Sequence, residues 1–166
     1  SVNEGLTSSQ IPALVISPGF REDQTLFVGT SIGAARSRDS GETWQAIGKE
    51  LENVEIRALA ISPSFGVDGS LLAGASESRV YMSTDRGESW RSVPSPSPDH
   101  EVIWVGFSSS YGQELEGIVD STFFVATSRE ATAEQTGLIA VFRTDNAGER
   151  WYQLHGHETR SRWVTV

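Results

Sequence analysis

The chain is built from short runs of apolar residues separated by polar turn residues. The runs at 14–16, 26–28, 59–61 and 123–125 are bounded by Gly, Ser, Pro or Asp, a pattern typical of β-strands. No window shows the 3.6-residue periodicity of an amphipathic helix. Because these runs are almost continuously apolar and do not alternate strictly, we expect sheets that are covered on both faces.

The same unit occurs three times along the chain. Residues 14–30 align without gaps on residues 59–75, and residues 105–127 repeat the pattern with a longer middle. Each unit predicts four short strands in about 46 residues, which is the content of one propeller blade. The predicted blades cover roughly 11–56, 57–101 and 102–160, and 161–166 are interpreted as the start of a further blade.

A turn motif lies near the end of each unit. It is SRDSGETW at 37–44, STDRGESW at 83–90 and RTDNAGERW at 143–151. Its aspartates, Asp39, Asp85 and Asp145, follow one another at intervals of 46 and 60 residues. The first two copies match the Asp-box, or bacterial neuraminidase repeat, in full. The chain therefore resembles the Asp-box β-propellers, a group that includes sialidase-like proteins, xyloglucanase-type glycosidases and photosystem assembly factors.

The third copy departs from the family pattern. Arg143 stands at the serine position, Ala147 is an extra residue, and Arg150 replaces the threonine. We expect this copy to keep the turn with altered geometry.

The residue types of the motif suit a tight hairpin. The Asp accepts N–H groups of its own turn, the Gly adopts a positive φ, and the Ser or Thr hydroxyl satisfies a further backbone group. The Trp is expected to wedge between neighbouring blades. The spacing lacks the run of oxygen ligands of a calcium loop, and the resemblance implies a turn away from the functional face. We interpret the motif as structural, with these residues: Ser37, Asp39, Gly41, Thr43, Trp44, Ser83, Asp85, Gly87, Ser89, Trp90, Asp145, Gly148 and Trp151.

The number of blades bears on whether the ring is complete. Closed propellers usually have about 4–8 blades, so three do not close a ring. The prediction is an all-β protein, a propeller segment of about three four-stranded antiparallel blades. It is either a fragment of a longer propeller or half of a six-bladed ring formed by two copies. Open blade edges leave apolar faces in water, which favours self-association.

The resemblance places binding on the loops that enter the first strand and join the second and third strands. The candidates on these loops are Arg57, Arg79, Asp99, His100 and Arg162. A sialidase needs three arginines for the sugar carboxylate, and Arg57, Arg79 and Arg162 are conceivable in that role. The available tyrosines lie beside motif elements, however, and the family's Phe/Tyr-Arg-Ile-Pro signature is absent.

A possible zinc pattern occurs near the C-terminal end. His155 and His157 alternate, with Glu158 following. The stretch is predicted to lie in a loop, and no third ligand is evident. No metal and no cofactor are therefore expected.

Composition limits the kinds of partner that the chain is expected to bind. The net charge is −9 and no basic face is evident, which argues against nucleic acid. No apolar run approaches the roughly 20 residues needed to cross a bilayer, and the absence of cysteine excludes disulfides. We therefore predict a non-catalytic binding module whose loop face meets a protein or a carbohydrate, in an extracellular or cell-envelope setting by family tendency. The alternative is a fragment of a sialidase-like or xyloglucanase-like glycoside hydrolase with catalytic residues partly outside the chain.

Overall fold

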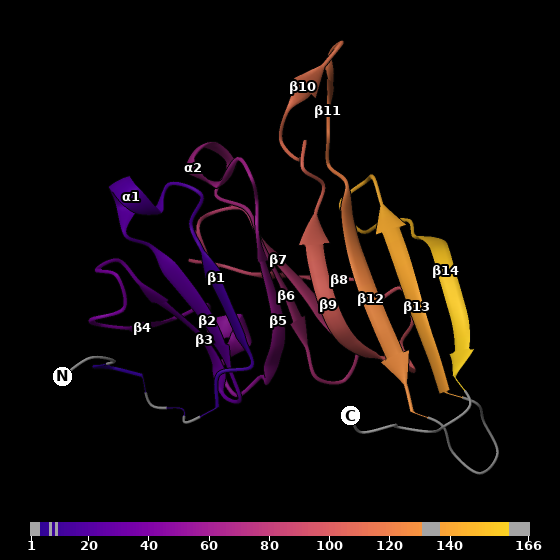
Figure 1. Cartoon of the computed structure of the whole chain (residues 1–166), viewed down its shortest axis with the longest axis horizontal. Coiled ribbons are helices and arrows are strands. Elements are labelled where there is room, and N and C mark those ends of the chain that lie inside the picture. The colour runs from indigo at the N-terminus through magenta and orange to yellow at the C-terminus, as the bar shows by residue number, and fades with distance from the viewer. Residues whose placement is uncertain (1–3, 7, 9, 131–136, 160–166) are drawn as a thin grey trace, which may run out of the picture.

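The computed structural model shows three four-stranded antiparallel sheets side by side (Figure 1). It describes residues 4–6, 8, 10–130 and 137–159. The first sheet consists of β1 (Ala13–Ile16), β2 (Leu26–Thr30), β3 (Gly33–Ser37) and β4 (Gln45–Ile47). The second consists of β5 (Ile56–Ile61), β6 (Leu71–Ala75), β7 (Val80–Ser83) and β8 (Arg91–Val93). The third consists of β9 (Glu101–Phe107), β12 (Phe123–Arg129), β13 (Gly137–Thr144) and β14 (Tyr152–Thr159).

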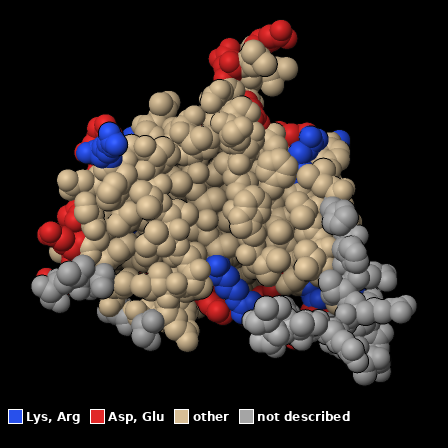
Figure 2. Space-filling model, in the orientation of Figure 1, with Lys and Arg blue, Asp and Glu red and all other residues tan. Residues whose placement is uncertain are grey.

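Within each sheet, every strand pairs with the strand before it in chain order, as in a propeller blade. The all-β partial propeller predicted from the sequence is confirmed. The predicted start of a further blade at 161–166 lies outside the described residues. Charged side chains gather round the rim in Figure 2, and uncharged residues cover the middle of the face shown there.

The middle strands of the first two sheets are buried on almost every residue, as the continuous apolar runs predict, whereas β12 and β13 of the third sheet and the run at 14–16 alternate between buried or partly buried and more exposed residues. Every residue of β3, β6 and β7 is buried, whereas β4 and β8 bury only their last residue. The contacts between sheets are made chiefly by the first and second strands, with β1 and β2 against β5 and with β5 and β6 against β9, and the fourth strands lie at the outer rim.

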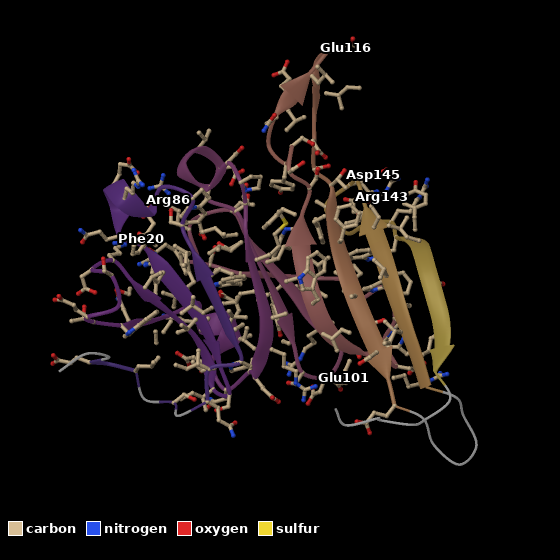
Figure 3. The ribbon with its side chains drawn as sticks, viewed as in Figure 1. Phe20, Arg86, Glu101, Glu116, Arg143 and Asp145 are labelled. Carbon is tan, nitrogen blue, oxygen red and sulfur yellow. The ribbon has the colours of Figure 1, made fainter. Side chains whose placement is uncertain are left out.

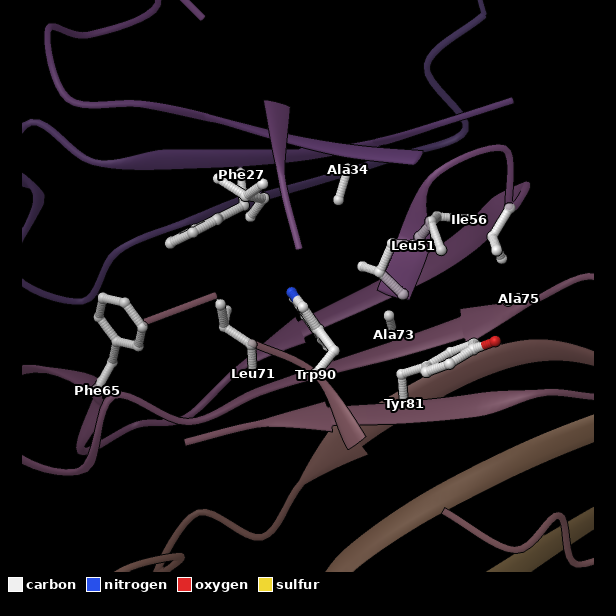
Figure 4. Close-up of a cluster of buried hydrophobic side chains, with 12 residues drawn as sticks. Phe27, Ala34, Leu51, Ile56, Phe65, Leu71, Ala73, Ala75, Tyr81 and Trp90 are labelled. Atoms are coloured by element: carbon white, nitrogen blue, oxygen red, sulfur yellow. The ribbon is translucent and has the colours of Figure 1, made fainter. Parts of the chain in front are cut away.

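Two apolar clusters join the three sheets. The cluster between the first and second sheets is drawn in Figure 4 and includes Phe27, Leu71 and Trp90. The cluster between the second and third sheets includes Leu72, Val93 and Phe123. Side chains with no exposed surface, such as Leu71 and Leu72, are each expected to contribute about 1.5–3 kcal/mol by burial.

A second motif shapes the connection from the first to the second strand. In the first blade, the Ser17 hydroxyl donates to Asp23 Oδ2 at 2.5 Å, and the same carboxylate accepts the Thr25 N–H at 2.8 Å. Between them lies one helical turn, α1 (Phe20–Asp23). The second blade repeats this with Ser62 and Asp68 around α2 (Phe65–Asp68).

In the third blade the same clasp holds a longer insertion. The Ser110 hydroxyl donates to Asp120 Oδ2 at 2.6 Å, and the Thr122 N–H donates to Oδ1 at 2.8 Å. Burial raises the pKa of Asp120, but these bonds outweigh it and lower the pKa to about 2. The insertion forms a hairpin of β10 (Glu114–Leu115) and β11 (Ile118–Val119), which projects at the end of the molecule where α1 and α2 lie (Figure 1).

Candidate functional site

The first two Asp-boxes use their polar side chains within the turn. In the first, the Ser37 hydroxyl donates to Asp39 Oδ1 at 2.7 Å and accepts the Gly41 N–H at 2.8 Å. Asp39 also accepts the backbone N–H of Thr43 at 2.9 Å and its hydroxyl at 2.6 Å. These bonds, led by the Thr43 hydroxyl, lower the pKa of Asp39 to about 2.

The second box has the same bonds. Ser83 and Ser89 donate to the Asp85 carboxylate, and the Gly87 N–H donates to the Ser83 hydroxyl. Burial raises the pKa of Asp85, but the hydrogen bonds of Ser89 and Ser83 lower it below its ordinary value. Because the carboxylates in both boxes are occupied by their own turns, their geometry fits a structural role.

The third box corrects the sequence alignment. The Thr144 hydroxyl donates to Asn146 Oδ1 at 2.9 Å and accepts the Gly148 N–H, and Asn146 Oδ1 accepts the Arg150 N–H at 2.9 Å. Thr144 and Asn146 therefore occupy the Ser and Asp positions, and no residue is inserted. The assignment of Asp145 as the motif aspartate, with Ala147 as an extra residue, is wrong. A Thr hydroxyl and an Asn amide oxygen offer the same donor and acceptor as Ser and Asp.

Each turn has a left-handed residue directly before its glycine. Ser40, Arg86 and Ala147 have φ of 60°, 63° and 57°, and the glycines that follow have φ of 92°, 86° and 90°. Two successive positive φ angles are strained for side chains with a Cβ, which accounts for the glycine of the motif.

The tryptophans differ in what covers them. Trp90 is 5% exposed, packs in the cluster between the first two sheets, and donates its indole N–H to the Gly87 carbonyl at 3.1 Å. Trp151 is half-buried, lies edge-on against Phe123 and donates to the Pro94 carbonyl of the second blade. Both lie between blades, as predicted.

Trp44 has no described sheet before it and is covered by the N-terminal segment. Its backbone N–H donates to the Glu4 carbonyl at 2.7 Å, and Leu6 packs against its cluster. Residues 4–6 thus cover Trp44 in the way that the end of the first blade covers Trp90 and the end of the second blade covers Trp151.

The predicted loop-face cations are paired with acids. Arg57 lies in β5 and bonds the carboxylates of Glu101 and, at 3.2 Å, Glu55; the Glu55 bond is the main cause of its raised pKa. Arg79 pairs with Glu77 at 3.3 Å. These pairs lie near the end of the molecule where Glu101 is labelled in Figure 3.

His100 is a core residue of this face. It is 6% exposed, its carbonyl accepts the Ser78 hydroxyl, and its Nδ1 lies 3.3 Å from Thr127 Oγ1. Burial lowers the pKa of His100, with a further contribution from Arg129. Asp99 is exposed beside it, and Arg162 lies outside the described residues.

The predicted loop position of the possible zinc pattern is wrong. His155 and His157 lie in strand β14, not in a loop, and pair with Val141 and Ile139. In the part of the chain that the structure describes, no cluster of three metal-ligating side chains occurs. Among the same residues, no helix is long and apolar enough to span a membrane.

A cavity of about 640 Å³ lies between the first two blades at the end opposite the predicted loop face. Its lining residues are Gly19, Glu22, Asp23, Thr25, Phe27, Arg36, Arg38, Phe65, Gly66 and Arg86. Phe27 and Phe65 meet edge to face inside it, with ring centroids 5.6 Å apart. Figure 3 places Phe20 and Arg86 at this end.

Three arginines line the cavity. Arg36 is 5% exposed, and its Nη1 donates to the Arg86 carbonyl at 3.0 Å and to Glu88 at 2.8 Å. Arg86 donates to the Gly66 carbonyl at 2.9 Å. Arg38 is 63% exposed along its side chain and lies 3.6 Å from Glu88. Sequence reasoning missed this group, although Arg38 and Arg86 fill variable positions of two Asp-boxes and Arg36 directly precedes one.

The inserted hairpin gives the same end of the molecule an apolar projection. Leu115, Ile118 and Val119 are 77%, 73% and 56% exposed. Exposed apolar side chains that are grouped in this way are a feature of interaction surfaces.

Three four-stranded sheets that pack through their broad faces and carry Asp-box hairpins define a β-propeller protein. The model of the Sortilin-Vps10 family, described as sortilin, neurotensin receptor 3, matches residues 33–166. The chain belongs to this family. No curated protein matches it.

Solved structures share the fold. An ancestral GH74 enzyme is 16% identical over 91% of this chain, with a TM-score of 0.57. YCF48 from Cyanidioschyzon merolae is 18% identical over 90%, with a TM-score of 0.62. A structure of YCF48 bound to D1 peptide is 15% identical over 90%, with a TM-score of 0.59. The chain spans 26%, 38% and 42% of these three chains.

Proposed function

We propose that this propeller segment is a non-catalytic binding module that takes a protein segment in the cavity between its first two blades. The observation that carries the proposal is the combination of two phenylalanines and three arginines in the lining of one cavity of about 640 Å³. Such mostly apolar concavities with a few polar groups are the usual form of a ligand site.

The lining favours a peptide with an apolar side chain next to a carboxylate. The edge-to-face pair of Phe27 and Phe65, which are 1% and 4% exposed, forms an apolar floor, and the exposed Arg38 guanidinium offers a planar donor for a carboxylate. The three arginines lie among Glu22, Asp23 and Glu88, so the exposed Arg38 is the guanidinium that is most available to a ligand carboxylate. The D1 peptide bound by the structural neighbour YCF48 supports a protein partner.

The carboxylates of the cavity argue against glycoside hydrolysis at this site. Glycosidases use two carboxyl groups, one as an acid and one as a base or nucleophile. The Asp23 carboxylate is occupied by the Ser17 hydroxyl and the Thr25 N–H. Of the acids that line the cavity, Glu22 is the other one, so the lining lacks a pair of available carboxyl groups. The likeness to a GH74 enzyme concerns the fold, and an enzymatic parent with catalytic residues elsewhere is the competing hypothesis.

An array of peptides that place an apolar residue beside Asp or Glu, with matched Asn and Gln copies, tests the proposal. We expect binding of acidic peptides that falls about 10–100-fold in Arg38→Glu, because a hydrogen bond to a charged group contributes about 1.5–3 kcal/mol. Arg21→Glu is the matched control, since it makes the same charge change on exposed α1 outside the cavity lining. The proposal is contradicted if the Asn and Gln peptides bind as well as the acidic ones, or if Arg38→Glu and Arg21→Glu lose the same affinity. It is also contradicted if no peptide of the array binds.

The loop face is a second candidate, for carbohydrate. Arg57 and Arg79 are each about one-third exposed. Arg57 bonds Glu55 and Glu101, and Arg79 pairs with Glu77, so both groups offer donors and acceptors for sugar hydroxyls. A glycan array with wild type, Arg57→Ala and Arg79→Ala checks this. Glycan binding that both variants abolish supports it, and binding that neither affects excludes this face.

A further inference from the structure

The insertion in the third blade ends in a hairpin with a defined backbone shape. β10 pairs with β11 so that Leu115 lies opposite Ile118. The two residues of the turn, Glu116 and Gly117, have φ of 54° and 79°, as in the type I′ turn that matches the twist of a hairpin. Because the hairpin is already formed, it loses little conformational freedom when it docks, which favours binding.

Two blades hold the base of this hairpin. Tyr111 is 7% exposed, packs in the cluster between the second and third sheets, and has its ring centroid 4.4 Å from that of Phe107. A Cβ atom added to Gly112 would lie 2.7 Å from Asp68 Oδ2, so the base is in direct contact with the clasp of the second blade. Together with the clasp of the third blade itself, these contacts fix the direction in which the hairpin projects.

The outer part of the hairpin carries apolar and acidic side chains. Residues that lie opposite each other in an antiparallel pair share a face, so Leu115 and Ile118, which are 77% and 73% exposed, form one apolar face. Glu114 and Glu116 are exposed beside it, and Figure 3 labels Glu116 at the outer end. Residues 113–119 contain no Lys or Arg, and Figure 2 shows acidic and uncharged side chains on this projection. The hairpin is therefore an apolar face bordered by negative charge.

The hairpin lies away from the surfaces through which the blades pack. The apolar clusters lie between the broad faces of the sheets, whereas the hairpin extends beyond the ends of β9 and β12 (Figure 1). A Cβ atom added to Gly117 would meet no atom within 4 Å. Since the blades of a propeller stack on the broad faces of their sheets, packing between blades does not account for the apolar side chains of the hairpin.

We propose that this hairpin is a docking element for a protein segment in which apolar side chains are flanked by Lys or Arg. The apolar side chains of the segment cover Leu115 and Ile118, and burial of these two side chains provides most of the affinity. The cations of the segment pair with Glu114 and Glu116, which gives the contact its charge specificity. The same carboxylates disfavour an anionic lipid surface, because like charges repel.

The apolar part of the proposal is tested with an array of linear peptides that place two apolar residues between Lys or Arg, and with copies that carry Glu at the basic positions. We expect the basic peptides to bind the 166-residue chain. Leu115→Ser and Ile118→Ser are each expected to weaken this binding at least about tenfold, since each removes a side chain that is buried on docking. Val67→Ser is the matched control, because Val67 is 94% exposed on α2 at the same end of the molecule (Figure 1).

Glu116→Lys tests the charge specificity. It is expected to weaken the binding of the basic peptides about 3–10-fold at low salt, with a smaller effect at high salt. Glu52→Lys makes the same charge change at an exposed position between the first two sheets and is expected to leave binding unchanged. Because the substituted side chains are exposed, each variant is expected to keep the wild-type Tm, and calorimetry thus separates a lost contact from a lost fold.

The proposal is overturned if no basic peptide binds, if the Glu copies bind as well, or if Leu115→Ser and Val67→Ser have equal effects. Vesicles of phosphatidylcholine and phosphatidylserine test a lipid surface instead. Vesicle binding that Leu115→Ser abolishes would make a membrane, and not a protein segment, the partner of the hairpin. The hairpin selects the opposite charge to the cavity between the first two blades, so Arg38→Glu is expected to leave the binding of basic peptides unchanged. The two surfaces are therefore tested separately.

Discussion

Trp90 is the side chain on which the junction of the first two blades most depends. It is 5% exposed and packs with Phe27 and Ile47 of the first blade. A Cβ atom added to Gly48 would lie 2.3 Å from the Trp90 ring. The chain at Gly48, just after strand β4, therefore lies in direct contact with the indole. Replacing Trp90 with Ala removes this packing and the indole N–H bond to Gly87.

The expected cost of Trp90→Ala is about 3–5 kcal/mol, the range for buried Trp or Phe cut to Ala. For a chain of this length each kcal/mol lowers Tm by about 2–4 °C, so Tm is expected to fall by about 6–20 °C. Trp90→Phe keeps most of the packing and loses the 3.1 Å hydrogen bond, which is about 1 kcal/mol plus the lost volume. Trp151→Ala is expected to cost about half as much as Trp90→Ala, since Trp151 is half-buried.

Urea unfolding of the three variants, followed by circular dichroism, gives the free energies, and calorimetry gives Tm. The order Trp90→Ala, Trp151→Ala, Trp90→Phe is the expected order of loss. A loss below about 1 kcal/mol for Trp90→Ala would refute the conclusion that this side chain joins the blades, as would equal losses for Trp90→Ala and Trp151→Ala.

Two further predictions concern the third blade. Asn146→Ala is expected to cost about 1–2 kcal/mol of unfolding free energy, because it removes the acceptor of two turn bonds. Asp145→Ala loses only an exposed pair with Arg143 and should cost less than about 0.5 kcal/mol. If urea unfolding gives the reverse order, Asp145 and not Asn146 is the motif residue of the third box. Because the pKa of His100 lies below its ordinary 6.5 in the folded chain, the unfolded chain binds the proton first, so stability should fall as pH is lowered from about 7 to 5. His100→Val, which places the residue of the equivalent Val54 there, should have a smaller pH dependence in unfolding experiments between these two pH values, and an unchanged slope would exclude His100 as the cause.

The strands and the first two Asp-boxes were predictable because their signals are local. A strand buried on both faces needs a continuous apolar run, and β2 contains the run at 26–28. The bonds of Ser37, Asp39 and Thr43 lie within one eight-residue turn.

The third box shows where an alignment by residue type alone fails. Asp145 matches the motif by residue type, but the turn selects its residues by the position of a hydroxyl and an oxygen acceptor, which Thr144 and Asn146 supply. The Ser-Asp clasp was missed for a related reason. Ser110 and Asp120 are ten residues apart, against six for Ser17 and Asp23, so an insertion hides the repeat.

The sequence by itself determined the class of fold, the repeat of the blades and the turn chemistry, because these depend on neighbours in the chain. Only the tertiary structure decided which polar groups are available for binding. Arg57 and Arg79 are candidates in the sequence, and folding pairs them with acids. Arg36 and Arg86 are fifty residues apart, and the packing of one sheet on the next brings them to the same cavity. Contacts between sheets depend on distance in space, which the order of residues along one strand does not specify.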